Sequence, residues 1–135
     1  TGVDRNRMSM LFAICEKHLK LELSSMDSFI NVIGGLKISD PACDLAVVSA
    51  VLSSNFDFSI PSDICFAGEV GLSGEIRPVA QTERRIMEAS RLGFKRIYVS
   101  SFCGLEGLKE QGVTDIEVVK VSDVPSLCRS LFKAG

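Results

Sequence analysis

The sequence predicts a mixed α/β domain in which helices pack against a β-sheet, and three observations support that fold class. Predicted strands and helices alternate through the second half of the chain. The glycine-rich segment 68–74, GEVGLSG, separates two apolar runs and is typical of a hairpin. The helix predicted over residues 42–56 is apolar or small on almost every side, which indicates burial between layers. We expect residues 1–135 to form one such domain.

The first half of the chain is predicted to hold two helices separated by an extended region. Apolar residues recur at helical spacing through residues 5–19, which predicts an amphipathic helix. Residues 21–23 and 29–33 are predicted to be two extended segments on either side of a Ser-Ser-Met-Asp turn. Pro41 then suits the first turn of the buried helix, in which Asp44 is the one charged residue.

The second half is predicted to begin with a hairpin and to continue with alternating helices and strands. The Gly-Leu-Ser-Gly linker should join strands 64–70 and 75–79. Helix 81–92 should end at Gly93. The remaining predicted elements are a buried strand at 95–101, a short helix or loop at 104–112, a strand at 116–121 and a helix at 122–133 capped by Ser122 or Asp123.

The composition is that of a folded globular domain, with 46% hydrophobic and 24% charged residues. The longest apolar runs are too short to span a membrane. The five cysteines are widely spaced and form no CxxC pair, so we expect reduced, largely buried thiols, a cytoplasmic location and no zinc site. The net charge of −2 gives no overall attraction to nucleic acid.

Three catalytic or nucleotide-binding interpretations receive little support. The segment GEVGLSG lacks the Gly-Lys-Ser/Thr ending of a phosphate loop and leads into a strand instead of a helix. His18 is the only histidine and is flanked by lysines, as a solvated surface residue would be. Cys43 opens the buried helix, where the helix dipole could activate a thiol, but no partner base is identifiable.

Basic residues gather locally despite the negative net charge. Residues 83–96 carry a local net charge of +3 and residues 1–20 carry +2. On the helix 81–92, the spacing of Arg84, Glu88 and Arg91 is also that of a solvated, salt-bridged face. The cluster therefore has two interpretations, a solvated helix face or a phosphate-contacting surface.

Three long segments carry a family resemblance. They are GVDRNRMSMLFAICEKH, FINVIGGLKISDPACDLAVVSAVLSS and GEVGLSGEIRPVAQTERRIMEASRLGFKRIYV. Together they resemble the C-terminal domain of the RadA (Sms) family of bacterial DNA repair and recombination proteins. That domain is in turn similar to the proteolytic domain of Lon protease, so the resemblance implies a ribosomal-protein-S5-domain-2-like fold.

The resemblance also implies that the Lon-type Ser/Lys catalytic pair is lost. The position of the serine nucleophile falls on Ala42 and that of the lysine base on Glu83. The segment Gly34-Gly35-Leu36-Lys37 is identical to the Gly-Gly-Leu-Lys segment that carries the lysine in Lon-type domains. It precedes the nucleophile segment, however, and so lies in the wrong element. We therefore expect a domain without peptidase activity.

The RadA resemblance implies a larger parent protein. Its family carries a zinc finger and a RecA-like ATPase core before this domain, so ATP, Mg²⁺ and Zn²⁺ are expected only there. The chain begins at Thr1, as a fragment of such a protein would. The family assembles as a hexameric ring on DNA and processes branched recombination intermediates. Sequence-independent phosphate contacts are expected at Arg5, Arg7, Arg77, Arg84, Arg85, Arg91, Lys95 and Arg96.

Three functional hypotheses remain. The chain is expected to be a non-catalytic scaffold and DNA-binding domain of a RadA-type protein. Alternatively, it is a purely structural ring-forming module whose arginines meet carboxylates instead of phosphates. The third hypothesis is an active peptidase with a displaced nucleophile such as Cys43.

Overall fold

The computed structural model describes residues 10–11, 13–14, 44–105 and 115–134. Its central element is a three-stranded parallel sheet with the strand order β1-β4-β5. The register pairs Ile64 with Arg96 across β1 and β4, and Arg96 with Glu117 across β4 and β5. In chain order the elements are α3 (Asp44–Phe56), β1 (Ile64–Ala67), β2 (Glu69–Val70), β3 (Ile76–Arg77), α4 (Thr82–Arg91), β4 (Arg96–Ser100), β5 (Glu117–Val121) and α6 (Val124–Ala134). The predicted mixed α/β class is confirmed.

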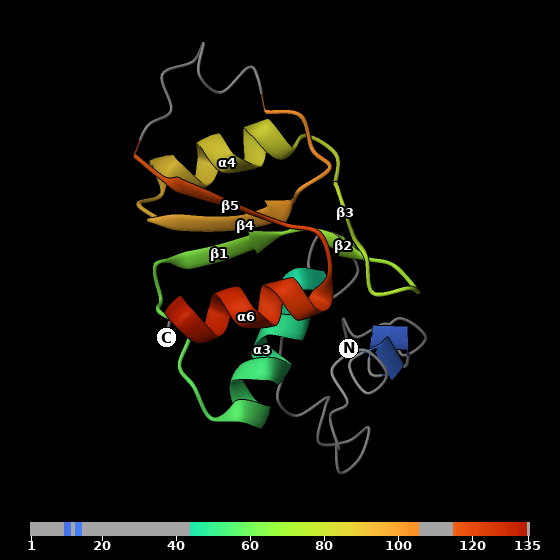
Figure 1. The fold of residues 1–135 in the computed structure, drawn as a ribbon. Coiled ribbons are helices and arrows are strands. Elements are labelled where there is room, and N and C mark those ends of the chain that lie inside the picture. Colours follow the sequence, from blue (N-terminus) through green and yellow to red (C-terminus); the bar gives the residue numbers. More distant parts are fainter. Residues whose placement is uncertain (1–9, 12, 15–43, 106–114, 135) are drawn as a thin grey trace, which may run out of the picture.

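Helices cover both faces of this sheet. Figure 1 shows α4 on one face and α3 with α6 on the other. The strands alternate accordingly, because successive side chains of a strand point to opposite faces. Ile97 and Val99 of β4 pack on the α4 side, whereas Tyr98 between them packs on the α3 and α6 side.

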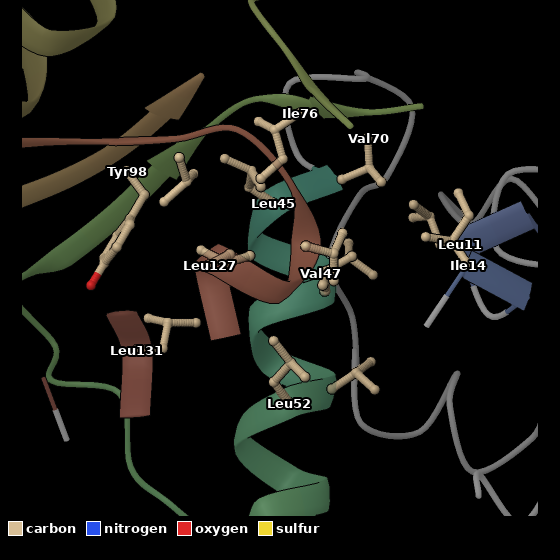
Figure 2. Close-up of a cluster of buried hydrophobic side chains, with 14 residues drawn as sticks. Leu11, Ile14, Leu45, Val47, Leu52, Val70, Ile76, Tyr98, Leu127 and Leu131 are labelled. Carbon is tan, nitrogen blue, oxygen red and sulfur yellow. The ribbon is translucent and has the colours of Figure 1, made fainter. Parts of the chain in front are cut away.

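The larger core lies between the sheet, α3 and α6. Figure 2 shows Leu45, Val47 and Leu52 of α3 beside Leu127 and Leu131 of α6. All five side chains are buried almost completely. The prediction that the helix within 42–56 is buried between layers is therefore confirmed, over the range that the structure describes.

A separate antiparallel hairpin is formed by β2 and β3, with Val70 opposite Ile76. Its turn is closed by the Gly71 N–H, which donates to the Glu75 carbonyl at 2.9 Å, and Gly74 adopts a φ of 79°. The predicted hairpin over the Gly-Leu-Ser-Gly linker is confirmed. The predicted single strand 64–70 is wrong, because the chain leaves β1 at Gly68 and enters β2 as part of a different sheet.

Gly68 divides the two strands because the chain there runs against α3. A Cβ atom at this position would lie 2.5 Å from Leu45 Cδ1. The Leu45 N–H also donates to the Gly68 carbonyl at 3.3 Å. Only glycine allows this close approach without displacement of the Leu45 side chain.

The ends of α4 and α6 follow local signals in the sequence. Gly93 follows α4 with a φ of 94°, in agreement with the predicted C-terminal glycine. Asp123 caps α6, because its Oδ1 accepts the Ser126 N–H at 2.8 Å. The Ser126 Oγ in turn accepts the Asp123 N–H at 3.3 Å, so the two residues form a reciprocal cap.

Several predicted elements lie wholly or mostly outside the described residues. Of the helix predicted at 5–19, Met10, Leu11, Ala13 and Ile14 are described and are helical. The extended region 21–33 lies outside the description, as does most of the segment 104–112.

Candidate functional site

A cleft of about 840 Å³ opens beside the carboxyl end of β4, at the N-terminus of α4. Strands and α4 run in opposite directions, so the beginning of α4 and the end of β4 lie at the same edge of the sheet (Figure 1). The cleft is lined by Pro78, Val79, Gln81, Thr82, Glu83, Arg84, Met87, Phe102, Cys103 and Gly104.

The wall formed by α4 begins with an unusual backbone conformation. Gln81, the N-cap residue, is left-handed with a φ of 58° and a ψ of 40°, which is uncommon for a residue other than glycine. The Thr82 hydroxyl donates to the Val79 carbonyl at 2.7 Å, and Arg85 Nε donates to the Ala80 carbonyl at 2.9 Å. These two bonds hold the turn that directs α4 toward the cleft.

The first turn of α4 borders the cleft, and the N-terminal end of a helix carries a partial positive charge. The first N–H groups of a helix have no partner within the helix. The Gln81 side chain makes no capping hydrogen bond to them. Glu83 and Arg84 extend from this turn and both line the cleft.

The opposite wall is the turn that follows β4, and Ser100 fixes it. The buried Ser100 Oγ donates to the Ile76 carbonyl at 2.7 Å and accepts the Phe102 N–H at 3.1 Å. The half-buried Cys103 lies close by, with its Sγ 2.9 Å from the Ser100 carbonyl. In this turn the Phe102 side chain is left 68% exposed.

Three of the predicted phosphate-contacting arginines pair with carboxylates of the same chain. Arg77 contacts Glu75 at 2.9 Å, and Arg91 contacts Glu88 at 3.0 Å. Arg96 contacts Glu117 across neighbouring strands at 2.6 Å. The pair of Glu88 and Arg91 is the i, i+3 contact that the helix spacing predicts. No ion pair between Arg84 and Glu88 is found within the described part of the chain.

The pairs shift the pKa of the groups they join. The hydrogen bond from Arg77 lowers the pKa of the Glu75 carboxyl below its usual value. The hydrogen bond to Glu117 raises the pKa of the Arg96 guanidinium, and a hydrogen bond to Tyr98 adds to this effect. Both shifts favour the charged forms that the ion pairs require.

The remaining predicted basic residues differ in their surroundings. Arg84 and Lys95 are exposed and make no ion pair within the described residues. Arg85 is half-buried and bonds to the turn that precedes α4. Arg5 and Arg7 lie outside the described residues.

The described basic residues of this region lie on α4 and near the start of β4. Arg84 and Arg91 are seven residues apart on α4, so they share its exposed face at a separation of about 10 Å along the helix axis. Lys95 and Arg96 instead line a smaller hollow of about 270 Å³ near the start of β4, together with the acidic residues Asp63 and Glu117.

The resemblance to Lon-type domains assigns the serine and lysine positions to Ala42 and Glu83, and the structure describes the second of them. Glu83 lines the cleft, whereas Ala42 and Cys43 lie outside the described residues. The first described residue of α3 is Asp44, whose side chain is fully buried. Its Oδ2 accepts the Val70 N–H at 2.9 Å, so this carboxylate joins α3 to the hairpin. Sequence reasoning did not assign that role.

The described residues contain neither a metal-binding cluster nor a membrane-spanning helix. Within the described ranges, no group of three or more His, Cys, Asp or Glu side chains is arranged to hold a metal ion. None of the helices in those ranges combines the length and apolar character that crossing a bilayer needs.

Comparison with known proteins places the chain in a family. The family model described as "Subunit ChlI of Mg-chelatase" matches residues 5–102, which include the hairpin, α4 and the end of β4. The chain belongs to the ChlI family. Of the residues that line the cleft, all except Cys103 and Gly104 lie within the range that the ChlI family model matches.

Curated relatives of this ChlI-family chain are named "DNA repair protein RadA". The protein of Bacillus subtilis is 43% identical over 131 residues, which cover 96% of this chain and 28% of that protein. The protein of Listeria monocytogenes is 48% identical over 73% of this chain and 22% of its own length. The protein of Escherichia coli is 38% identical over 93% of this chain and 27% of its own length. The chain thus spans less than a third of each of these relatives.

Proposed function

We propose that this chain is a non-catalytic scaffold and DNA-binding domain of a RadA-type DNA repair protein acting in homologous recombination. The observation that carries the proposal is the 43% identity to a DNA repair protein RadA over 96% of the chain. The proposed fold is the S5-like, Lon-type arrangement, with which the parallel sheet and its covering helices are compatible.

The proposed DNA contacts are made to phosphates. Arg84 supports this role because it is exposed, lies at the positive end of α4 and makes no ion pair within the described residues. Arg91 shares its helix face and is 77% exposed at the side chain, so the weak surface pair with Glu88 can open toward a phosphate. Arg77, Arg85, Lys95, Arg96, Arg5 and Arg7 complete the proposed set.

In this proposed role the domain has no catalytic activity of its own, and ATP hydrolysis belongs to other parts of the parent protein. A Lon-type peptidase needs a lysine where Glu83 stands, and a carboxylate there provides no such base. ATP, Mg²⁺ and Zn²⁺ would be bound by the parent's other domains. The proposed ring is a hexamer located in the cytoplasm, in which several copies of the domain act together on one DNA molecule.

A DNA titration at two salt concentrations tests the proposal. Fluorescence anisotropy of a labelled oligonucleotide should rise on addition of the chain at low salt, and the affinity should fall steeply as salt increases. Arg84→Gln should weaken binding more than Arg91→Gln, because Arg91 is already partly neutralised by Glu88. Absence of binding at low salt by a chain of native circular dichroism would contradict the DNA role.

One observation favours the structural alternative. Phe132 of α6 is 53% exposed and Phe56 of α3 is 38% exposed, and their rings meet edge to face at 5.7 Å. An exposed aromatic pair of this kind suits contact with another protein surface. If Phe132→Ser changes the sedimentation of the chain while DNA binding is absent throughout, the structural alternative is preferred.

A further inference from the structure

The cleft at the N-terminus of α4 combines an exposed aromatic ring with an available cation. The Phe102 side chain is 68% exposed, and Met87 on the facing helix is 37% exposed. Water is therefore in contact with apolar surface that a ligand could cover. Arg84 lies on the same cleft, exposed and without an ion pair in the described residues.

The charged side chains of the cleft determine where the phosphate of an anionic ligand would bind. Arg84 and the first N–H groups of α4 attract a phosphate, whereas the neighbouring Glu83 repels it. A phosphate is therefore favoured at the Arg84 side and disfavoured close to Glu83. The apolar surface of Phe102 and Met87 suits an uncharged, flat group instead.

We propose that this cleft binds an unstacked base of single-stranded DNA, which stacks on Phe102 while Arg84 contacts the adjoining phosphate. The inference rests on the proposed DNA-binding function and names the form of DNA that this site takes. Aromatic side chains beside a positive groove are the usual means of binding single strands without sequence preference.

Single-stranded DNA fits this arrangement better than a duplex. Phe102 stands in a turn and not on a long helix or ribbon that could enter a groove. In a duplex the faces of the bases are covered by their neighbours, so a ring such as Phe102 can reach only a base that has left the stack. A duplex could meet Arg84 through its phosphates but would leave Phe102 uncovered.

The sequence offers a direct spectroscopic test, because the chain contains no tryptophan. Phe102→Trp places a single indole in the cleft. Leu92→Trp is the matched control, since Leu92 is 72% exposed and follows the opposite end of α4. Oligothymidylate should quench the fluorescence of the Phe102→Trp chain and leave that of the Leu92→Trp chain nearly unchanged. A duplex of equal length should quench neither.

Affinity measurements complete the test. Phe102→Ala should weaken oligothymidylate binding about 5- to 150-fold, the range that corresponds to the loss of one base stack. The same substitution should change duplex binding by less than about twofold. Because Phe102 is mostly exposed, circular dichroism should show an unchanged fold.

The possible outcomes separate this inference from the proposed function. If the unsubstituted chain binds both forms of DNA and Phe102→Ala leaves both affinities unchanged, the base-stacking site is overturned and the DNA-binding function stands. If the chain binds no DNA, both are overturned. Quenching of Phe102→Trp by an acidic peptide and not by oligothymidylate would also overturn the inference and indicate a peptide site.

Discussion

The Asp44 carboxylate accepts a hydrogen bond from the Val70 N–H at 2.9 Å, with the Asp44 side chain fully buried. The contact joins the first turn of α3 to the hairpin strand β2. A carboxylate in the first turn of a helix also opposes the positive end of the helix dipole. Asp44 therefore links two elements that are separated by 26 residues in the chain.

Replacement of Asp44 should destabilise the chain. Asp44→Ala leaves the Val70 N–H buried without its acceptor, which costs about 1–3 kcal/mol of unfolding free energy. Asp44→Asn retains an amide oxygen of similar size and should cost less. Urea unfolding followed by circular dichroism measures both changes. Equal stability of the alanine variant and the unsubstituted chain would show that the hydrogen bond contributes nothing.

Elements with local signals could be predicted from the sequence. The amphipathic spacing and the glycine after it define α4, and an Asp-Val-Pro-Ser segment caps α6. The contact between Glu88 and Arg91 likewise follows from helix geometry alone. In each case the residues that decide the structure are within a few positions of one another.

Features that depend on tertiary packing could not be predicted in the same way. The division of the segment 64–70 at Gly68 reflects the Leu45 side chain, which comes from another element. The pair of Arg96 and Glu117 depends on the register of β4 and β5. The exposure of Phe102 follows from the way Ser100 holds the turn after β4, and no pattern in the sequence separates it from a buried aromatic.

The close approach of Gly68 to Leu45 predicts a coupled pair of substitutions. Gly68→Ala should cost about 1–3 kcal/mol, because its methyl group would overlap the fully buried Leu45 side chain. In a chain that also carries Leu45→Ala, the added cost of Gly68→Ala should fall by at least about 0.5 kcal/mol.

Gly93→Ala is the control for that double-mutant cycle. A Cβ atom at Gly93 would meet no atom within 4 Å, so its cost arises from the φ of +94° alone. It should amount to about 1–2 kcal/mol and should be independent of Leu45→Ala. Additive effects of Gly68→Ala and Leu45→Ala in urea unfolding would contradict the steric explanation.

The Cys65 thiol should react only at unusually high pH. Burial raises its pKa from 9.0 to about 11. Alkylation by iodoacetamide, followed at Cys65 by peptide mass spectrometry, should therefore have a midpoint near pH 11 in the folded chain. In urea the midpoint should fall to about 9.

The same shift gives the sign of a pH effect on stability. The pKa of Cys65 is higher in the folded state than in the unfolded state. The contribution of the protonated thiol to the free energy of unfolding is therefore fully present below pH 9.0 and is lost as the pH rises toward about 11. Cys65→Ser should reduce the loss of stability over this interval. A folded-state alkylation midpoint equal to that in urea would show that the thiol is not shielded from water.

Glu83 should oppose DNA binding, which gives a substitution expected to raise affinity. Glu83 lies beside Arg84 in the cleft, so Glu83→Gln removes a charge that repels the phosphate bound there. The affinity for oligothymidylate should rise about two- to fivefold at low salt, and the gain should shrink as salt screens the charge. Asp57→Asn is the control, because it makes the same change of net charge at an exposed residue that follows α3, and asparagine tolerates the φ of 54° there. An equal gain from both substitutions would show that the gain comes from the net charge of the chain. The bound phosphate would then lie too far from Glu83 to be repelled by it.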